Sequence, residues 1–456
     1  MKKLALLALA GITIASCKTE PTKDYMIFSG KIDNLDKKEI QLRGYEFNDK
    51  VKVNTDGTFS DTLKLNDGYY SFYDGKKSID LYLNKVKDLN VTYDLKDSTN
   101  TITFTGKNAS INTYLLKKGK QTKKTLGSTK DLYSLEETHF LAKLNKAKDD
   151  AKRLVESSNF DNSLKQIELK NIDYNYANNL NRYASYHPYF AKKKDFKASE
   201  TFPNPTKGMD LNNEDDYKNS SAYRSIVGSN YSKLAADKSE KDDSDYSLNY
   251  MIFVKEKATN KNIADKLLYD NAKYGITYTE QLQEFYKKFM EYSSNEENKK
   301  EITKTYNKLK VTAKGQPSPK FVNYENFKGG TTSLDDLKGK YVYVDVWATW
   351  CGPCKKEIPS LKKVEKQYHG KNIEFVSMSV DSKKDHDAWK KMVKEKELGG
   401  IQLFADKSWD SKFVKDYVIQ GIPRFILINP EGKIVTANAP RPSSKKLIKL
   451  FDKLKI

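Results

Sequence analysis

Two cysteines, Cys351 and Cys354, stand two residues apart in the stretch VDVWATWCGPCKKEIP, which runs from Val344 to Pro359. Thiols at this spacing can form half of a zinc site, a structural disulfide or a redox couple. The run before the pair is apolar, as in a buried strand, and the residues after it are typical of a helix. A helix N-terminus lowers the pKa of a thiol, so the position favours a working dithiol couple.

The zinc and structural interpretations find little support elsewhere in the chain. A zinc site needs two further ligands, but the nearby histidines, His369 and His386, lie 17 residues apart and no second cysteine pair follows. A static disulfide across two residues closes a very small loop and adds little stability through chain entropy. We therefore expect a redox-active disulfide between Cys351 and Cys354, with no metal and no cofactor.

The motif WCGPCK after VDVWATW resembles the active site of the thioredoxin superfamily. The arrangement over residues 316–456 resembles the extracytoplasmic TlpA/ResA-like branch of membrane-tethered disulfide reductases. The resemblance implies that Cys351 is the exposed attacking thiolate and that Cys354, one turn deeper, resolves the mixed disulfide. The other matching positions of this stretch are Trp350, Gly352, Pro353 and Pro359, the last of which falls on the proline that bends the active-site helix.

Two further positions match the family. Asp345, six residues before Cys351, falls on the buried acid, whose pKa burial would raise so that it exchanges a proton with the Cys354 sulfur. Pro423, which follows Ile422, falls on a cis-proline that leaves the neighbouring backbone free to pair with an extended substrate. The alternatives are a carboxyl that only forms hydrogen bonds in the core and a plain turn.

The sequence departs from the simple thioredoxins at two positions. Ser377 stands where they carry a lysine close to the buried acid, so proton handling by Asp345 is expected to differ. Arg424 follows the predicted cis-proline, where they have a small polar residue. A cation there would stabilise a thiolate or attract an acidic substrate, or else it is a surface charge.

The first residues are typical of an export signal. Lys2 and Lys3 precede a short apolar run, too short to span a bilayer, and IASC ends at Cys17. This resembles a bacterial lipobox, which implies cleavage before Cys17 and lipidation of its thiol. An ordinary signal peptide followed by a chance cysteine is the alternative. We predict a signal peptide over 1–16, a tether over 17–24 and a chain lipid-anchored in the cell envelope, extracytoplasmic and on the periplasmic face.

Periodicity divides the rest of the chain into three predicted domains. Residues 25–107 alternate β-branched and aromatic residues with polar ones between Asp-Gly turns, which predicts a small antiparallel β domain of unknown role. Residues 108–312 are poor in Gly and Pro and show helical spacing, which predicts an all-α domain. There Ser134 and Glu137 are predicted to form a capping box. Strand and helix patterns alternate over 313–456, after a Gly/Pro linker, and predict an α/β thioredoxin fold. The β domain resembles those ahead of thioredoxin-like domains in Bacteroidetes lipoproteins.

The net charge of +20, from 81 basic and 61 acidic residues, does not indicate nucleic-acid binding. Lysines are interleaved with acidic residues and no nucleic-acid motif is present, so attraction to an anionic membrane surface is favoured.

The family resemblance implies thiol–disulfide exchange, and the Gly352-Pro353 dipeptide favours a protein disulfide reductase over an oxidase or isomerase. The expected partners are disulfide-containing exported proteins, among them apocytochromes in cytochrome c maturation, and a membrane thiol electron donor. An envelope binding module with an accessory thioredoxin domain is the alternative from another class, and a peroxidase-like enzyme is disfavoured by the CGPC motif.

Overall fold

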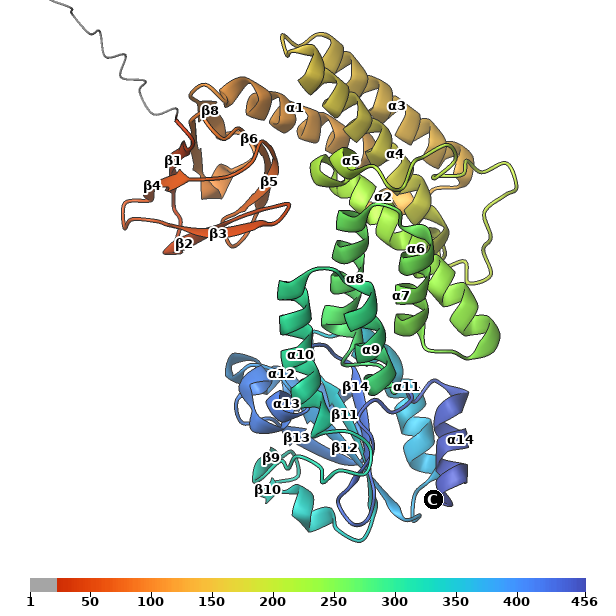
Figure 1. Ribbon diagram of the computed structural model, residues 1–456. Helices are drawn as coiled ribbons and strands as arrows, with labels where there is room; N and C mark the ends of the chain where they lie inside the picture. The colour runs from red at the N-terminus through yellow and green to blue at the C-terminus, as the bar shows by residue number, and fades with distance from the viewer. Residues whose placement is uncertain (1–22) are drawn as a thin grey trace, which may run out of the picture. The chain divides into compact units, whose positions relative to one another are not determined.

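The computed structural model describes residues 23–456 (Figure 1). The predicted signal peptide, Cys17 and most of the predicted tether lie outside the described residues. The chain divides into two compact units, with the boundary between Ile226 and Val227. This boundary falls inside one helix of the predicted all-α domain, so the second half of that domain belongs to the same compact unit as the C-terminal residues.

The first unit begins with two four-stranded sheets, in the orders β4-β1-β7-β8 and β3-β2-β5-β6. Alternate residues of the strands, such as Phe28 and Phe72, meet in one shared core, so the predicted β domain is confirmed. One pair departs from the antiparallel pattern, because β1 and β7 run parallel. The strands are β1 (Met26–Asp33), β2 (Glu39–Gly44), β3 (Phe47–Lys52), β4 (Thr58–Leu63), β5 (Gly68–Tyr73), β6 (Ser78–Leu83), β7 (Leu89–Asp94) and β8 (Thr103–Thr105).

The region predicted to be all-α is helical. Its helices are α1 (Ala109–Leu126), α2 (Thr129–Tyr133), α3 (Glu137–Glu156), α4 (Asn162–Phe190), α5 (Glu214–Asn219), α6 (Ser221–Asp242), α7 (Tyr246–Lys257), α8 (Lys261–Gly275), α9 (Leu282–Tyr292) and α10 (Glu296–Lys310). The predicted capping box is wrong, because Ser134 ends α2 and its hydroxyl donates to the Lys130 carbonyl. The capping box of α2 is formed by Ser128 and Asp131 instead.

The second unit contains a seven-stranded sheet in the order β10-β9-β13-β12-β11-β14-β15. The central strands β11, β12 and β13 run parallel, and β14 is antiparallel to β11. The strands are β9 (Tyr324–Asn326), β10 (Thr331–Thr332), β11 (Tyr341–Trp347), β12 (Ile373–Ser379), β13 (Ile401–Phe404), β14 (Arg424–Ile428) and β15 (Ile434–Thr436). The helices are α11 (Gly352–Gln367), α12 (His386–Glu395), α13 (Lys412–Asp416) and α14 (Lys445–Leu454).

Both faces of this sheet are covered, which explains the continuous apolar sequence of β11. Helices α11 and α14 lie on one face and α12 and α13 on the other (Figure 1). Val344 packs into the core on the α12 and α13 side, whereas Tyr343 packs against Phe451 of α14. Because side chains alternate along a strand, Asp345 lies on the same side as Tyr343, beneath α11.

The segment predicted as a linker is hydrogen-bonded to the C-terminal hairpin. The Gly315 N–H donates to the Ile434 carbonyl at 2.7 Å, and the Ser318 N–H donates to the Gly432 carbonyl at 2.9 Å. Its backbone is therefore fixed to the thioredoxin fold. Within residues 23–456, no helix is both long enough and apolar enough to cross a membrane.

Candidate active site

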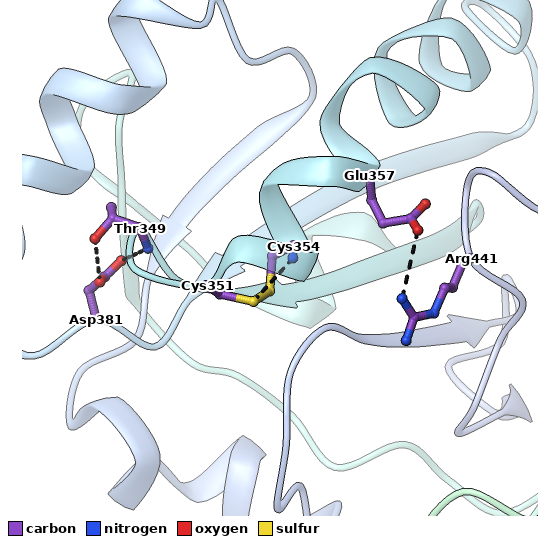
Figure 2. The surroundings of a disulfide bond; sticks show 6 residues. All are labelled: Thr349, Cys351, Cys354, Glu357, Asp381 and Arg441. Carbon is purple, nitrogen blue, oxygen red and sulfur yellow. Dashed lines mark hydrogen bonds and ion pairs between the residues drawn. A yellow bond between two sulfur atoms is a disulfide. The ribbon is translucent and has the colours of Figure 1, made fainter. Parts of the chain in front are cut away.

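A disulfide joins Cys351 and Cys354 at the start of α11, with their Cα atoms 5.3 Å apart (Figure 2). Cys351 is the N-cap of the helix, and its Sγ accepts a hydrogen bond from the Cys354 N–H at 3.1 Å. The free N–H groups and the positive end of the helix dipole therefore face the Cys351 sulfur. This environment stabilises negative charge on that atom, as thiol–disulfide exchange requires.

The turn between β11 and the cysteines is anchored by Asp381, which follows β12 and is fully buried. Its carboxylate accepts from the Thr349 N–H at 2.9 Å and from the Thr349 hydroxyl at 2.7 Å (Figure 2). The Ser379 hydroxyl donates to it as well, at 2.7 Å. Asp381 thus fixes the backbone immediately before Trp350 and Cys351. No local sequence pattern marks Asp381 for this role.

The surface at this turn is formed by Trp350, which is 57 % exposed. The expectation that Cys351 is exposed is wrong for the disulfide form, because Cys351 and Cys354 are each only 4 % exposed. Their sulfur atoms are bonded to each other, and both residues belong to an apolar cluster that includes Trp347.

Asp345 is buried directly beneath the disulfide region, as predicted. Burial, with the negative charges of Glu357 and Glu365, raises its pKa to about 8. Ser377 lies beside it on β12, where the sequence placed it. Hence no lysine on the neighbouring strand offsets the burial of Asp345, and its carboxyl carries a proton at neutral pH.

A small cavity lies between Asp345 and α11. It offers about 10 Å³ to the centre of a water-sized sphere, and its walls include Cys354, Asp345, Glu365 and Gln402. Asp345 Oδ1 and Gln402 Oε1 are buried and have no hydrogen-bond partner among the described residues. The cavity therefore has the size and polarity that suit one bound water molecule between these groups.

Two acidic residues of α11 were missed by the sequence analysis. Glu357 is buried, accepts hydrogen bonds at 3.0 Å from the N–H and hydroxyl of Ser443, and lies 3.8 Å from Arg441 (Figure 2). Burial raises the pKa of Glu365 to about 7, and Lys362 opposes the shift. The available signal was helical spacing, because Glu357 follows Cys354 by three residues and so shares its face.

The peptide bond between Ile422 and Pro423 is cis, as predicted. Ile422 is half-buried and packs against the apolar cluster that contains both cysteines. Among the described residues, no hydrogen bond is found for the main-chain N–H and C=O of Ile422. These groups are therefore available to pair with an added strand.

Arg424 is not a surface charge, and that alternative is wrong. The residue is only 2 % exposed, because its side chain points into the fold toward the turn after α8. Its guanidinium donates to the carbonyl and hydroxyl oxygens of Thr277 and lies 4.1 Å from the ring centroid of Tyr278.

The matching family model is described as Redoxin and covers residues 313–448. The chain is similar to the thiol-disulfide oxidoreductase ResA of Bacillus subtilis (strain 168), with 34 % identity over 125 residues, or 27 % of this chain and 65 % of that protein. It is also similar to the thioredoxin-like protein YneN of the same organism, with 28 % identity over 161 residues, or 33 % of this chain and 86 % of that protein. The chain thus spans just under two thirds of the length of ResA.

Among solved structures, the chain is similar to the thioredoxin domain of a thiol-disulfide oxidoreductase from Bacteroides vulgatus. The identity is 34 %, the match covers 31 % of this chain and 97 % of that one, and the TM-score is 0.29. Each of these matches covers about a third of the chain or less.

Proposed function

We propose that this chain, which belongs to the TlpA/ResA-like branch of the thioredoxin family, reduces disulfides in exported proteins. The observation that carries the proposal is the Cys351–Cys354 disulfide at the N-terminus of α11 with the buried Asp345 beneath it. The Gly352-Pro353 dipeptide supports electron donation over electron acceptance.

In the proposed reaction, the Cys351 thiolate attacks one sulfur of the substrate disulfide and releases the first substrate thiolate. Cys354 then loses its proton to Asp345 in the ionised form of this carboxyl, which is in equilibrium with the protonated form because its raised pKa of about 8 lies close to that of an ordinary thiol. The Cys354 thiolate attacks the Cys351 sulfur, and the second substrate thiolate leaves and takes up a proton. Two electrons pass from the dithiol to the substrate, and the enzyme is left as the disulfide.

The cycle closes only when an external thiol reduces the enzyme disulfide again, and we assign this role to a membrane thiol donor. Anchoring through a lipid on Cys17, on the extracytoplasmic side of a membrane, would bring the enzyme close to that donor. A Cys17→Ser variant is expected to leave the membrane fraction, whereas a variant that stays bound would remove the lipid anchor from the proposal.

The proposed function is tested by capturing substrates as covalent mixed disulfides. In Cys354→Ser the second step is blocked, so mixed disulfides with substrates should accumulate through Cys351 and be identified by mass spectrometry. The matched control is Cys351→Ser, which keeps Cys354 and should trap nothing. A Cys354→Ser chain that forms no adduct in its native envelope would contradict the proposed function.

A second candidate function is a binding module served by the first unit, and a cavity of about 670 Å³ in that unit favours it. The cavity has the size of a small-molecule site, and its walls include the buried Glu168 and its half-buried ion-pair partner Lys118. If Cys351→Ser retained the complete phenotype of the wild-type chain, the binding function would replace the enzymatic one.

A further inference from the structure

The turn that follows α8 packs on the loop that precedes β14, and both lie in the second compact unit. Arg424 donates to Thr277 and faces the ring of Tyr278, as described above. On the other side of the turn, the Asn438 side-chain amide donates to the Tyr278 carbonyl. We call these four residues, Thr277, Tyr278, Arg424 and Asn438, the clasp.

The turn after α8, which carries Thr277 and Tyr278 of the clasp, is held in place by hydrogen bonds within the helical region. The N–H groups of Tyr278 and Thr279 donate to the Gly275 carbonyl at 2.9 and 3.1 Å. The Thr279 hydroxyl donates to the Asp245 carboxylate at 2.8 Å. Because these bonds fix the turn, the position of Tyr278 is set before binding. The residue therefore loses little conformational freedom when another molecule contacts it.

Tyr278 stands next to the unpaired backbone of Ile422. A Cβ atom added at Gly421, the residue before Ile422, would lie 2.8 Å from the Tyr278 hydroxyl oxygen, so the two residues are in close contact. Tyr278 is also 36 % exposed, whereas Arg424 beneath it is buried. A polypeptide strand that pairs with Ile422 therefore meets an aromatic ring and a hydroxyl from the turn after α8, outside the thioredoxin fold.

We propose that Tyr278 is a specificity-determining residue, which contacts the extended polypeptide that carries the disulfide to be reduced. The ring offers apolar contact area and the hydroxyl offers a hydrogen bond to the substrate backbone. The inference rests on the proposed function and deepens it. Tyr278 favours disulfides within extended chains over small disulfides, which are too short to reach the clasp.

The experiment compares two substrates with pre-reduced, full-length mature protein: insulin, a disulfide-bonded polypeptide, and cystamine, a small aliphatic disulfide. For Tyr278→Ala, the second-order rate constant for oxidation of the pre-reduced protein is expected to fall about tenfold with insulin and to change less than about twofold with cystamine. The matched control is Tyr274→Ala, which removes a 56 % exposed ring from the last turn of α8, four residues before Tyr278, and should affect neither substrate. Tyr278→Phe, which keeps the ring, should retain most of the insulin activity.

Equal losses with both substrates would show a structural role for Tyr278 and overturn the inference. Unchanged or faster reduction of insulin would overturn it too, because the ring would then make no contact with the substrate or would hinder access to the Ile422 backbone. A wild-type chain that reduces neither substrate would instead contradict the proposed function itself, so the two failures are distinguishable.

Discussion

Two ionisable side chains, Asp345 and Arg424, are buried in the thioredoxin fold, and their surroundings differ. Burial, with the charges of two acidic neighbours, raises the pKa of Asp345 to about 8, and one of its oxygens has no hydrogen-bond partner among the described residues. Arg424 directly follows the cis-proline Pro423. Its guanidinium donates hydrogen bonds to two oxygens of Thr277 and faces the ring of Tyr278. A buried carboxyl without partners takes up a proton, whereas a partnered guanidinium keeps its charge and fixes its neighbours. We assign proton transfer to the first region and substrate positioning to the second.

The largest expected effect is on proton transfer. Asp345→Asn keeps the shape of the side chain but cannot accept the Cys354 proton, so closure of the mixed disulfide should slow about a hundredfold near neutral pH. Stopped-flow measurement of substrate release checks this. Ser377→Ala, at the neighbouring position on β12, is the matched control and should stay within about twofold. An Asp345→Asn enzyme with the wild-type rate would remove Asp345 from the mechanism.

The next largest expected effect is that of Arg424 on the stability of the fold. Arg424→Gln removes a buried cation from Thr277 and Tyr278 and should lower the free energy of unfolding by about 2 kcal/mol. Urea denaturation of the disulfide form measures it. The pH dependence of disulfide exchange should stay as in the wild type. A shifted pH profile would mean that Arg424 changes the pKa of the thiols. Proton transfer could then no longer be assigned to the Asp345 region alone.

The raised pKa of Asp345 is expected to make the free energy of unfolding depend on pH, with a smaller change per pH unit. The unfolded carboxyl has its ordinary pKa near 3.8 and the folded one about 8, so between these values the folded chain holds one proton more. The contribution is fully present below the lower pKa and is lost as pH rises through the upper one. Unfolding free energy should therefore fall by roughly 1.4 kcal/mol per pH unit in this window relative to Asp345→Asn, by urea denaturation at several pH values. Parallel curves for the two proteins would contradict the raised pKa.

Much of the active site could be predicted from the sequence because its residues lie in short, contiguous stretches. Asp345 lies on one strand, Cys351 and Cys354 stand at the start of the helix that follows it, and Pro423 belongs to a recognisable tripeptide. Glu357 was missed because its burial depends on Ser443, 86 residues downstream. A glutamate on a lysine-rich helix otherwise has the pattern of a solvated face.

The clasp could not be predicted at all, because its residues are even farther apart in the sequence. Arg424 meets Thr277 across 147 residues, and no local pattern reports such a contact. The alternation of the N-terminal strands indicated which side chains face the core but not which strand pairs with which, so the parallel pairing of β1 and β7 was missed. Helical periodicity likewise identified the helices without assigning α7 to α10 to the unit of the thioredoxin fold.

The central claim is that the Cys351–Cys354 couple donates electrons, and its midpoint potential tests this most directly. The mature full-length chain would be equilibrated in thiol–disulfide buffers of defined potential, and its free thiols alkylated and counted by mass spectrometry. A donor should give a value near about −270 mV, that of a reducing thioredoxin. A value near about −120 mV, that of a strong disulfide-forming oxidant, would contradict the proposed direction of electron flow.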